Sequence, residues 1–354
     1  MHKREFLRAV SAGCLGMTLR AGSASAQAPP GAAADDDPLK GVMLIDAHAH
    51  PDQLAGGRRV DLSSTLKSIK AVGMSASSFS AVGDSERSGV WSSRTLNDVL
   101  LELDRVKRLA EYGQVKLVLT SQDIPGPGAA GNRPGAILCI EGGNPLRGDP
   151  SKVDECRDYG VRLITLLHYS VNELGDCMTA RPHHNGLTPA GRKVVQRMEK
   201  LGLVVDVAHA HSNTLRSIVE IAEKPLIDSH TSPCPQQDSS RCGRLRAWED
   251  MELIAKTGGV ICLWPLAYQG SHSRRETLRD WALDVLEMKK RLGIEHVGLG
   301  TDGGGQLPAL VKGYHDVTDL RSLGASLRDA GLSRDDIAAF LGGNFYRVFK
   351  QCAG

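Results

Sequence analysis

The sequence predicts an α/β fold of the (β/α)8 TIM-barrel type, and three observations support this. Short apolar runs recur along the chain, with helix-like stretches between them. Several runs are continuously rather than alternately hydrophobic, which is typical of strands buried on both faces of a parallel sheet. Eight strand–helix units in roughly 310 residues match such a barrel with insertions. An open doubly wound sheet is the alternative, and the lack of a glycine-rich phosphate loop after the first run disfavours it.

Eight runs are expected to form the barrel strands. They are residues 42–50, 75–82, 135–143, 161–170, 201–211, 224–232, 258–265 and 295–305. A ninth run, residues 115–120, is expected to add a hairpin element. Amphipathic helices are expected between the runs, for example over residues 96–113 and 188–202. In the second of these, Thr188 is expected to cap the start and Gly202 to end the helix.

The composition is that of an ordinary globular protein. Of the 354 residues 41% are hydrophobic, and 43 basic against 41 acidic residues give a formal net charge of +2. This balance gives no electrostatic footprint for nucleic acid. After the N-terminal segment, no stretch approaches the roughly 20 apolar residues of a membrane helix. We therefore expect a single (β/α)8 domain over residues 41–354, with no nucleic-acid partner and no integral membrane segment in the mature chain.

The first residues have the pattern of an export signal peptide. Residues 1–26 combine a basic start, a weakly apolar centre and a small-x-small cleavage site that would release Gln27. The stretch "KREFLRA" resembles a twin-arginine signal with Lys3 in place of the first arginine. Residues 27–40 are expected to be a flexible linker. The expected location is therefore periplasmic or secreted; a lipoprotein anchor at Cys14 and an ordinary cytosolic N-terminus are the alternatives.

The cysteines allow a disulfide but do not require one. Eight are present, and removal of Cys14 with the signal leaves seven, an odd number. Their spacings match no zinc motif. Cys234 and Cys242 are suitably spaced for a bridge across a loop, and a disulfide or a pair of buried thiols are both open at this point.

Side chains that bind metals stand at the ends of most predicted strands, where barrels of this type carry their chemistry. They are His48, His50, Glu141, His168, His209, His230 and Asp302. His48 and His50 face the same way, because side chains alternate along a strand. A single buried histidine is usually a core residue with satisfied hydrogen bonds. The coincidence at successive strand ends instead predicts a site for Zn²⁺ or a similar divalent ion.

The remaining candidates carry weaker signals. Asp46 and Asp206 are expected either to fix histidine tautomers or to bind backbone N–H groups, with equal weight. Four histidines are expected in loops, at a cap or at the opposite end of the barrel: His183, His184, His211 and His296. His272 and His315 lie in polar loops, and no role is assigned to them.

Beyond these patterns, the sequence resembles the membrane (renal) dipeptidase family of binuclear zinc metallopeptidases, which share an amidohydrolase-like barrel. The matching pieces are, in order, "IDAHAHPD", "AILCIEGG", "RLITLLHYSVNELGD", the block 185–214, "PLIDSHTS", "HVGLGTD" and "GGNFYRVF". They extend from Ile45 to Phe349, which is nearly the whole mature chain. The block 185–214 and the closing "GGNFYRVF" are the most diagnostic pieces.

The resemblance implies two bound divalent ions, expected to be Zn²⁺. His48 and His50 would bind one ion, Glu141 would bridge the two, and His209 and His230 would complete the second site. One departure is notable, because the family usually has His-x-Asp on the first strand and this chain has His50 in the aspartate position. Replacing a carboxylate by an imidazole makes the metal site one charge more positive.

The resemblance also implies roles in binding and catalysis. His168 would hold the substrate's carbonyl oxygen or the developing oxyanion, and Asp302 would take and return protons. Glu141 would act in catalysis through the bridged metals. Arg244 falls where the family has an arginine that grips the carboxylate of a dipeptide. The neighbouring Arg241 and Arg246 leave that last assignment open.

The function implied is hydrolysis of the peptide bond of dipeptides by a hydroxide that bridges the two metals. The partner is a small dipeptide substrate, and a homodimer is possible because homodimers are common in the family. The first alternative is another amidohydrolase that acts on a cyclic amide, lactam or lactone. The second is a non-catalytic exported binding protein that kept the barrel.

Overall fold

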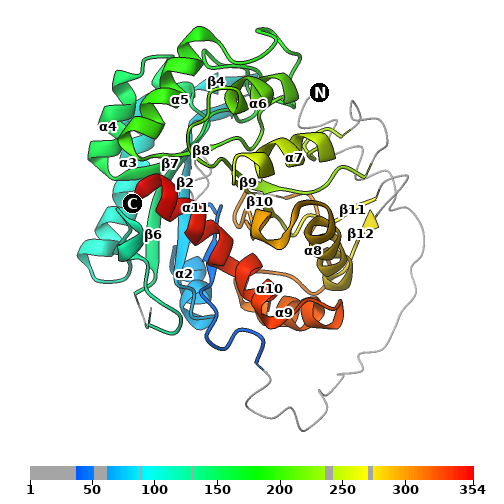
Figure 1. Ribbon diagram of the computed structural model, residues 1–354. Helices are drawn as coiled ribbons and strands as arrows, with labels where there is room; N and C mark the ends of the chain where they lie inside the picture. Colours follow the sequence, from blue (N-terminus) through cyan, green and yellow to red (C-terminus); the bar gives the residue numbers. More distant parts are fainter. Residues whose placement is uncertain are drawn as a thin grey trace.

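A parallel eight-stranded sheet forms the centre of the molecule, whose structure is a computed structural model (Figure 1). The structure describes residues 37–51, 62–87, 90–129, 131, 133–235, 242–269, 274–305 and 307–354. The predicted signal peptide, most of the predicted linker, Arg241 and His272 lie outside these residues. In sheet order the strands are β1 (Ile45–Asp46), β2 (Ala76–Val82), β6 (Gly135–Glu141), β7 (Val161–Thr165), β8 (Val204–Asp206), β9 (Ile227–Thr231), β10 (Val260–Leu263) and β13 (Val297–Leu299).

The sheet closes into a barrel through backbone hydrogen bonds between its first and last strands. The amide of Ala47 donates to the carbonyl oxygen of Leu299 at 3.0 Å, and the amide of Asp302 donates to that of His48 at 2.8 Å. Each of the eight predicted runs contains one of these strands. The predicted (β/α)8 fold is confirmed, although the regular part of each strand is shorter than its apolar run.

The ninth run does not form a hairpin. Strand β5 (Lys116–Leu117) pairs parallel with β6, with Lys116 opposite Gly135. The prediction was wrong because the chain turns through the 3-10 helix η1 (Ser121–Asp123) and returns to start β6 in the same direction. The antiparallel pairs follow β2 and β10 instead. They are β3 (Asp84–Arg87) with β4 (Val90–Ser93), and β11 (Tyr268–Gln269) with β12 (Arg274–Arg275).

Helices connect the strands and cover the outside of the barrel (Figure 1). Those between successive barrel strands are α2 (Leu62–Ala71), α3 (Leu96–Glu111), α4 (Ser151–Tyr159), α5 (Pro189–Leu201), α6 (Ser212–Val219), α7 (Trp248–Lys256) and α8 (Leu278–Leu292). After β13 come α9 (Leu320–Asp329), α10 (Arg334–Ala338), the π-helical turn η6 (Ala339–Gly343) and α11 (Asn344–Ala353). Short 3-10 turns are η2 (Asn144–Leu146), η4 (Ile294–His296) and η5 (Val317–Asp319). The predicted ends of α5 are confirmed, since the Thr188 hydroxyl accepts from the Gly191 amide and Gly202 is left-handed.

The core has an inner and an outer part. Inside the barrel, Ile45, Ile137 and Leu163 pack with Phe345 and Phe349 of α11. Helix α11 therefore covers the end of the barrel where the strands begin. A larger cluster fills the space between the strands and the surrounding helices. Because one end is packed with apolar side chains, polar chemistry is left to the other end, where the strands finish.

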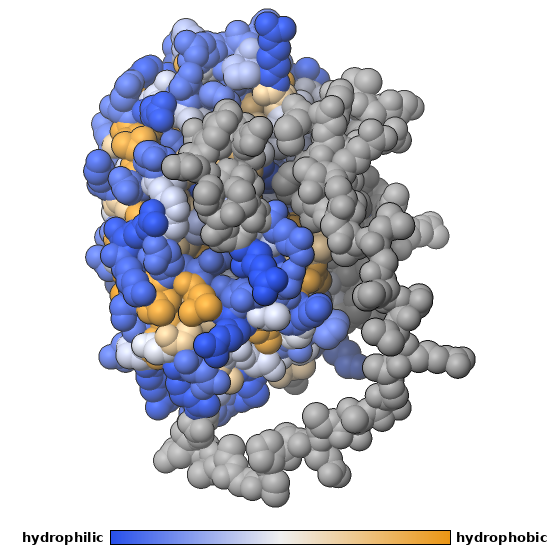
Figure 2. Space-filling view, turned by 90° about the vertical axis from the view of Figure 1, so that its right-hand side faces the viewer, coloured by the Kyte–Doolittle hydropathy of each residue, from blue (hydrophilic) through white to orange (hydrophobic). Residues whose placement is uncertain are grey.

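The described surface is mostly hydrophilic. Figure 2 shows one face on which hydrophobic residues form small, separated groups. Large hydrophobic side chains that are exposed in the described part are Leu101, Tyr112, Leu119, Leu283 and Leu310. Within the same part, none of the helices combines the length and apolar character needed to cross a membrane.

Candidate metal centre

The predicted strand-end residues meet around the carboxylate of Glu141, at the end of β6. Its Oε2 atom lies 3.1 Å from Nε2 of His50. Its Oε1 atom lies 3.1 Å from Nε2 of His209, 3.3 Å from Nε2 of His230 and 3.4 Å from Nε2 of His48. Two groups of ligand atoms therefore share one carboxylate: His48, His50 and Glu141 form the first, and Glu141, His209 and His230 form the second.

Pairs of ring nitrogens at this centre face one another at hydrogen-bonding distance. Nε2 of His48 lies 3.1 Å from Nε2 of His50, and Nε2 of His209 lies 3.0 Å from Nε2 of His230. Nδ1 of His50 donates to the carbonyl oxygen of Ser80 at 2.8 Å, so in the neutral ring its Nε2 carries a lone pair. Two lone pairs at such a distance repel each other unless a cation or a shared proton lies between them, and the carboxylate of Glu141 beside both pairs adds a negative charge that favours a cation. The donor set therefore fits divalent metal ions.

Burial and charge keep His209, His230 and Glu141 in the protonation states that metal binding requires. Burial, with the charge of Arg244, holds the pKa of His209 well below its usual value. Burial, with His48, does the same to the pKa of His230. Burial acts to raise the pKa of Glu141, but His168 and His48 outweigh it and hold that pKa well below its usual value. His209 and His230 thus present neutral imidazoles to an ionised carboxylate. Burial acts to lower the pKa of His50, but Glu141 and Asp302 outweigh it and raise that pKa to about 9, so metal binding there would release a proton.

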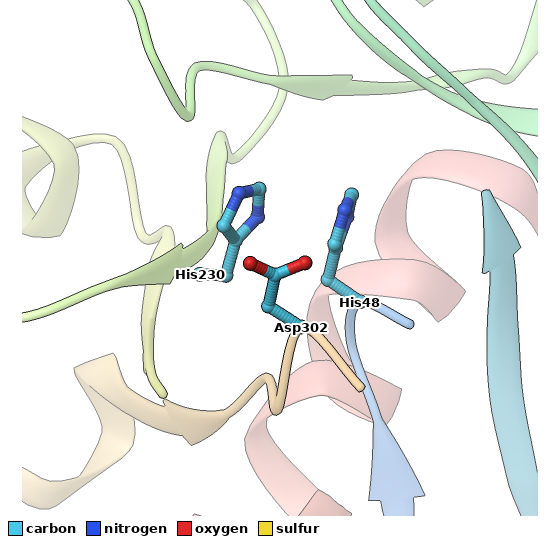
Figure 3. Close-up of side chains that lie close together, drawn as sticks. All are labelled: His48, His230 and Asp302. Carbon is cyan, nitrogen blue, oxygen red and sulfur yellow. The ribbon is translucent and has the colours of Figure 1, made fainter. Parts of the chain in front are cut away.

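Asp302, just beyond the end of β13, points into the same centre. Figure 3 shows its carboxylate directed towards His48 and His230, whose rings are stacked with centroids 3.9 Å apart. Its Oδ1 atom lies 3.6 Å from Nε2 of His50. Burial, joined by the negative charge of Glu141, raises the pKa of Asp302. A carboxyl group with a raised pKa, beside the metal donors, is suited to accept and return a proton.

Two of these residues have an unusual backbone. His209 and Asp302 lie in the left-handed region, with φ of 64° and 50°. Such a conformation costs on the order of 1–3 kcal/mol in a residue with a side chain, and it is concentrated at functional sites. Here it follows the last regular residues of β8 and β13 and turns both side chains towards Glu141.

The sequence did not reveal the partner of His168. Nδ1 of His168 lies 2.6 Å from Oδ1 of the fully buried Asp84, which also accepts a hydrogen bond from the Ser170 hydroxyl at 2.8 Å. Nε2 of His168 points inward, 3.4 Å from Oε2 of Glu141. Burial acts to lower the pKa of His168, but Glu141 and Asp84 outweigh it and raise that pKa. A partial signal was available, because Asp84 stands two residues beyond the end of the predicted run 75–82.

Asp46 and Asp206 both accept hydrogen bonds from backbone amides, which for Asp206 are those of Ala208 and Ser229, each at 3.0 Å. Asp206 in addition reaches a histidine ring. Asp46 accepts hydrogen bonds from the amides of His48 and Thr301 and from the Thr301 hydroxyl. Of the two roles expected for Asp46, these contacts match the binding of backbone N–H groups. Asp206 accepts from the Ser229 hydroxyl at 2.6 Å, and Ser229 Oγ lies 2.9 Å from Nδ1 of His230. Because the Ser229 proton goes to Asp206, its oxygen accepts from His230. Asp206 therefore orients the His230 ring through Ser229.

Of Arg244 and Arg246, which the structure describes, Arg244 is the one that reaches the centre. Its Nη2 donates to the carbonyl oxygen of His230 at 2.8 Å, its Nε lies 3.3 Å from Nε2 of His209, and its guanidinium stacks 4.9 Å from the ring centre of Trp264. Trp264, at the end of β10, is a further residue that the sequence did not single out. Arg246 instead pairs with Asp228 at 2.8 Å. Arg241 lies outside the described residues.

The other histidines stand away from the centre, as expected. His211 caps α6, since its Nδ1 accepts from the Asn213 amide at 3.2 Å. His183 and His184 are exposed in the loop before α5. Nδ1 of His296 donates to the carbonyl oxygen of Gly259 at 2.8 Å, at the start of β13.

Residues 42–353 match the sequence profile of the membrane dipeptidase family, peptidase family M19. The chain belongs to this family. A curated relative, an uncharacterized dipeptidase of Schizosaccharomyces pombe (strain 972), is 29% identical over 263 residues, which cover 72% of this chain and 62% of the relative. A second, dipeptidase aclJ of Aspergillus oryzae, is 30% identical over 217 residues, which cover 60% of this chain and 50% of the relative. The match thus spans between half and two thirds of the length of these M19 relatives.

Solved structures show the same fold. An amidohydrolase from Pseudomonas aeruginosa superposes with a TM-score of 0.75 at 17% identity, covering 89% of this chain and 98% of that one. A metallo peptidase from Rhodobacter sphaeroides, solved with a phosphinate mimic of the dipeptide L-Ala-D-Ala, gives a TM-score of 0.72 at 18% identity, covering 88% and 99%. At these identities the likeness supports the barrel of the M19 chain and not the details of its site.

Proposed function

We propose that the protein is a zinc-dependent dipeptidase that hydrolyses the peptide bond of dipeptides with two metal ions. The observation that supports this most directly is the sharing of Glu141 between two histidine pairs, one with His48 and His50 and one with His209 and His230. Two divalent ions held by these residues would lower the pKa of a shared water towards neutrality, which would supply a hydroxide, and would polarise the scissile carbonyl.

The chain's own groups would orient the substrate and move the proton. Nε2 of His168, held towards the centre by Asp84, is placed to donate to the carbonyl oxygen as negative charge develops on it. The carboxyl group of Asp302 is placed to take a proton from the nucleophile and pass it to the departing amine. Burial of both groups strengthens these interactions, because little water screens them.

Arg244 would select dipeptides by their length. It is fully buried and forms no ion pair with a carboxylate among the residues that the structure describes, whereas the neighbouring Arg246 is paired with Asp228. A buried guanidinium without a counter-ion is costly and favours an anionic ligand. The free C-terminal carboxylate of a dipeptide would supply that charge, and a longer peptide would place a neutral amide there.

The test is a hydrolysis panel with purified protein loaded with Zn²⁺. Dipeptides of L-L and L-D configuration are compared with the same dipeptides as C-terminal amides, with tripeptides and with cyclic amides, lactams and lactones. We expect turnover of free dipeptides, at least about 100-fold weaker turnover of the amides, and loss of activity in Glu141→Gln. Turnover of cyclic compounds without any dipeptide hydrolysis would replace this proposal by the other amidohydrolase function.

We also propose that the protein is exported to the periplasm or secreted. The leader-like residues 1–26 support this, and so does the disulfide between Cys234 and Cys242, because such bonds persist in oxidising compartments. Cell fractionation of the full chain tests the proposal, and recovery of uncleaved protein in the cytosol contradicts it.

A further inference from the structure

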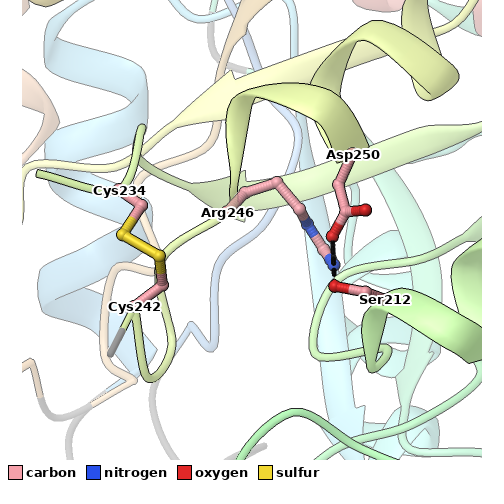
Figure 4. Close-up of a disulfide and its surroundings, with 5 residues drawn as sticks. All are labelled: Ser212, Cys234, Cys242, Arg246 and Asp250. Atoms are coloured by element: carbon pink, nitrogen blue, oxygen red, sulfur yellow. Dashed lines mark hydrogen bonds and ion pairs between the residues drawn. A yellow bond between two sulfur atoms is a disulfide. The ribbon is translucent and has the colours of Figure 1, made fainter. Parts of the chain in front are cut away.

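The connection from β9 to α7 carries Arg244 next to a disulfide. Figure 4 shows the bond between Cys234 and Cys242, whose Cα atoms lie 5.3 Å apart. Arg244 follows Cys242 by two residues in the sequence. The pairing of these two cysteines was one of the two outcomes left open by the sequence. The five other cysteines within the described ranges are free and buried. This disulfide is therefore the covalent constraint nearest to the substrate-binding arginine.

The other side of Arg244 is fixed by Arg246. The Arg246 guanidinium donates to Asp228 at 2.8 Å and to the carbonyl oxygens of Ala210 and Val207 at 2.7 and 2.9 Å. The Cys234 amide also donates to the carbonyl oxygen of Arg246 at 2.8 Å. Arg244 thus lies between two fixed points, the disulfide on one side and the anchored Arg246 on the other.

Arg244 needs such a constraint because its position is costly. It is fully buried, and among the described residues it is held by the carbonyl oxygen of His230, the ring of Trp264 and weaker contacts rather than by a carboxylate. A buried charge without a counter-ion favours any conformation that returns it to water. Without the disulfide, the segment before Arg246 gains the freedom to turn Arg244 outward.

We propose that the Cys234–Cys242 disulfide is a positioning element that keeps Arg244 inside the pocket and thereby sets the affinity for the substrate carboxylate. The inference rests on the proposed dipeptidase function. The disulfide limits the conformational freedom of the chain that carries Arg244. Loss of the disulfide should therefore weaken carboxylate binding by about tenfold. The metal donors come from strand ends and are not part of this segment, so the chemical step is affected little.

The experiment compares the Zn²⁺-loaded wild type, a Cys234→Ser/Cys242→Ser double variant, and the wild type reduced with a phosphine. We expect KM for a dipeptide to rise about tenfold with kcat within about twofold, and KM for the matching dipeptide amide to stay unchanged. In an Arg244→Ala background, removal of the disulfide should add nothing further, because its effect passes through that residue. The phosphine should not alter the double variant.

A second readout does not depend on activity. Phenylglyoxal modifies accessible arginines, and peptide mapping identifies the sites. We expect Arg244 to be protected in the oxidised protein and modified after reduction, while Arg246, which is equally buried but paired with Asp228, stays protected in both states. Arg246 is thus the matched control within the same segment.

The outcomes separate the two proposals. An equal change in KM for the dipeptide and its amide, an additive effect with Arg244→Ala, or unchanged protection of Arg244 after reduction would overturn the positioning role. Absence of dipeptide hydrolysis by the Zn²⁺-loaded wild type would overturn the proposed function instead. In that case the modification experiment alone decides whether the disulfide holds Arg244.

Discussion

The contact between Asp84 and His168 leads to a quantitative prediction. Asp84 is fully buried, its Oδ1 lies 2.6 Å from Nδ1 of His168, and its other oxygen accepts from Ser170. In the substitution Asp84→Asn, a charged acceptor becomes a neutral amide of the same size. The substitution also removes one of the charges that raise the pKa of His168, so the ring would less often carry protons on both nitrogens, as donation from Nε2 with Nδ1 held by residue 84 requires.

The magnitude follows from the kind of hydrogen bond that is lost. Bonds to charged groups contribute roughly 1.5–3 kcal/mol, and neutral ones roughly 0.5–1.5 kcal/mol. If the loss of His168 orientation raises the free energy of the transition state more than that of the bound substrate, kcat/KM for a dipeptide should fall by about 10- to 100-fold. The larger part should appear in kcat, because His168 acts on the charge that develops on the carbonyl oxygen.

The assay is steady-state hydrolysis with metal content measured on the same samples. Ser170→Ala is the matched control, since it removes the other contact of Asp84 and keeps the carboxylate; it should cost no more than about fivefold. Asp84→Asn should retain its metal, because Asp84 contacts His168 and Ser170 rather than the shared carboxylate of Glu141. Wild-type kcat/KM in Asp84→Asn, with normal metal content, would refute the orienting role.

Three further predictions concern the metals and the loop after β7. Glu141→Gln should lose at least one of two bound ions by elemental analysis, and retention of both would contradict the bridge. Chelation should lower the free energy of unfolding by about 2.7 kcal/mol when the free ion had been at 100 times its Kd, measured by denaturant titration. Asp176 accepts from the amides of His183, His184 and Gly186; burial acts to raise its pKa, but these bonds outweigh it and lower the pKa. A lowered pKa means that this stabilisation is present above pH about 4 and is lost as the pH falls through the folded-state pKa. Asp176→Asn should therefore cost about 1–3 kcal/mol at pH 7 and little near pH 2, and an equal cost at both would contradict the assignment.

The sequence predicted the barrel and most of the centre for one physical reason. Buried parallel strands leave continuous apolar runs, and polar side chains that end such runs meet at one end of a closed sheet. Glu141, His209 and His230 are each found in this way. The pairing of β5 was not predictable from its run, because the direction of a short edge strand depends on the path of the loop that follows it.

Other parts of the site depend on contacts that no local pattern encodes. Asp84 opens a hairpin after β2 and becomes a partner of His168 only through the folding of β2 beside β6 and β7. Arg244 and Arg246 are the same residue type two positions apart, and Asp228 decides which of them is structural. Close packing of the backbone also matters: a Cβ atom on Gly83 would overlap the carbonyl oxygen of Gly142, directly after Glu141.

The charges at the centre favour an anionic substrate over a neutral ring. Glu141 and Asp302 are the carboxylates that face the metal donors, and burial raises the pKa of Asp302, which weakens its contribution as an anion. Two divalent ions, as proposed, would bring four positive charges, so the loaded centre would keep a positive excess even with both carboxylates ionised, and the guanidinium of Arg244 would add to it. His50, an imidazole where the family pattern has a carboxylate, increases this excess.

In a buried site such an imbalance is weakly screened and draws in negative charge. In the proposed function a dipeptide would deliver its carboxylate to Arg244 with its peptide bond at the metals, whereas an uncharged lactam would deliver no such charge. The same positive excess would make Arg244 costly to bury before substrate arrives. The proposed role of the disulfide in holding Arg244 and the proposed preference for an anionic substrate therefore have the same physical cause.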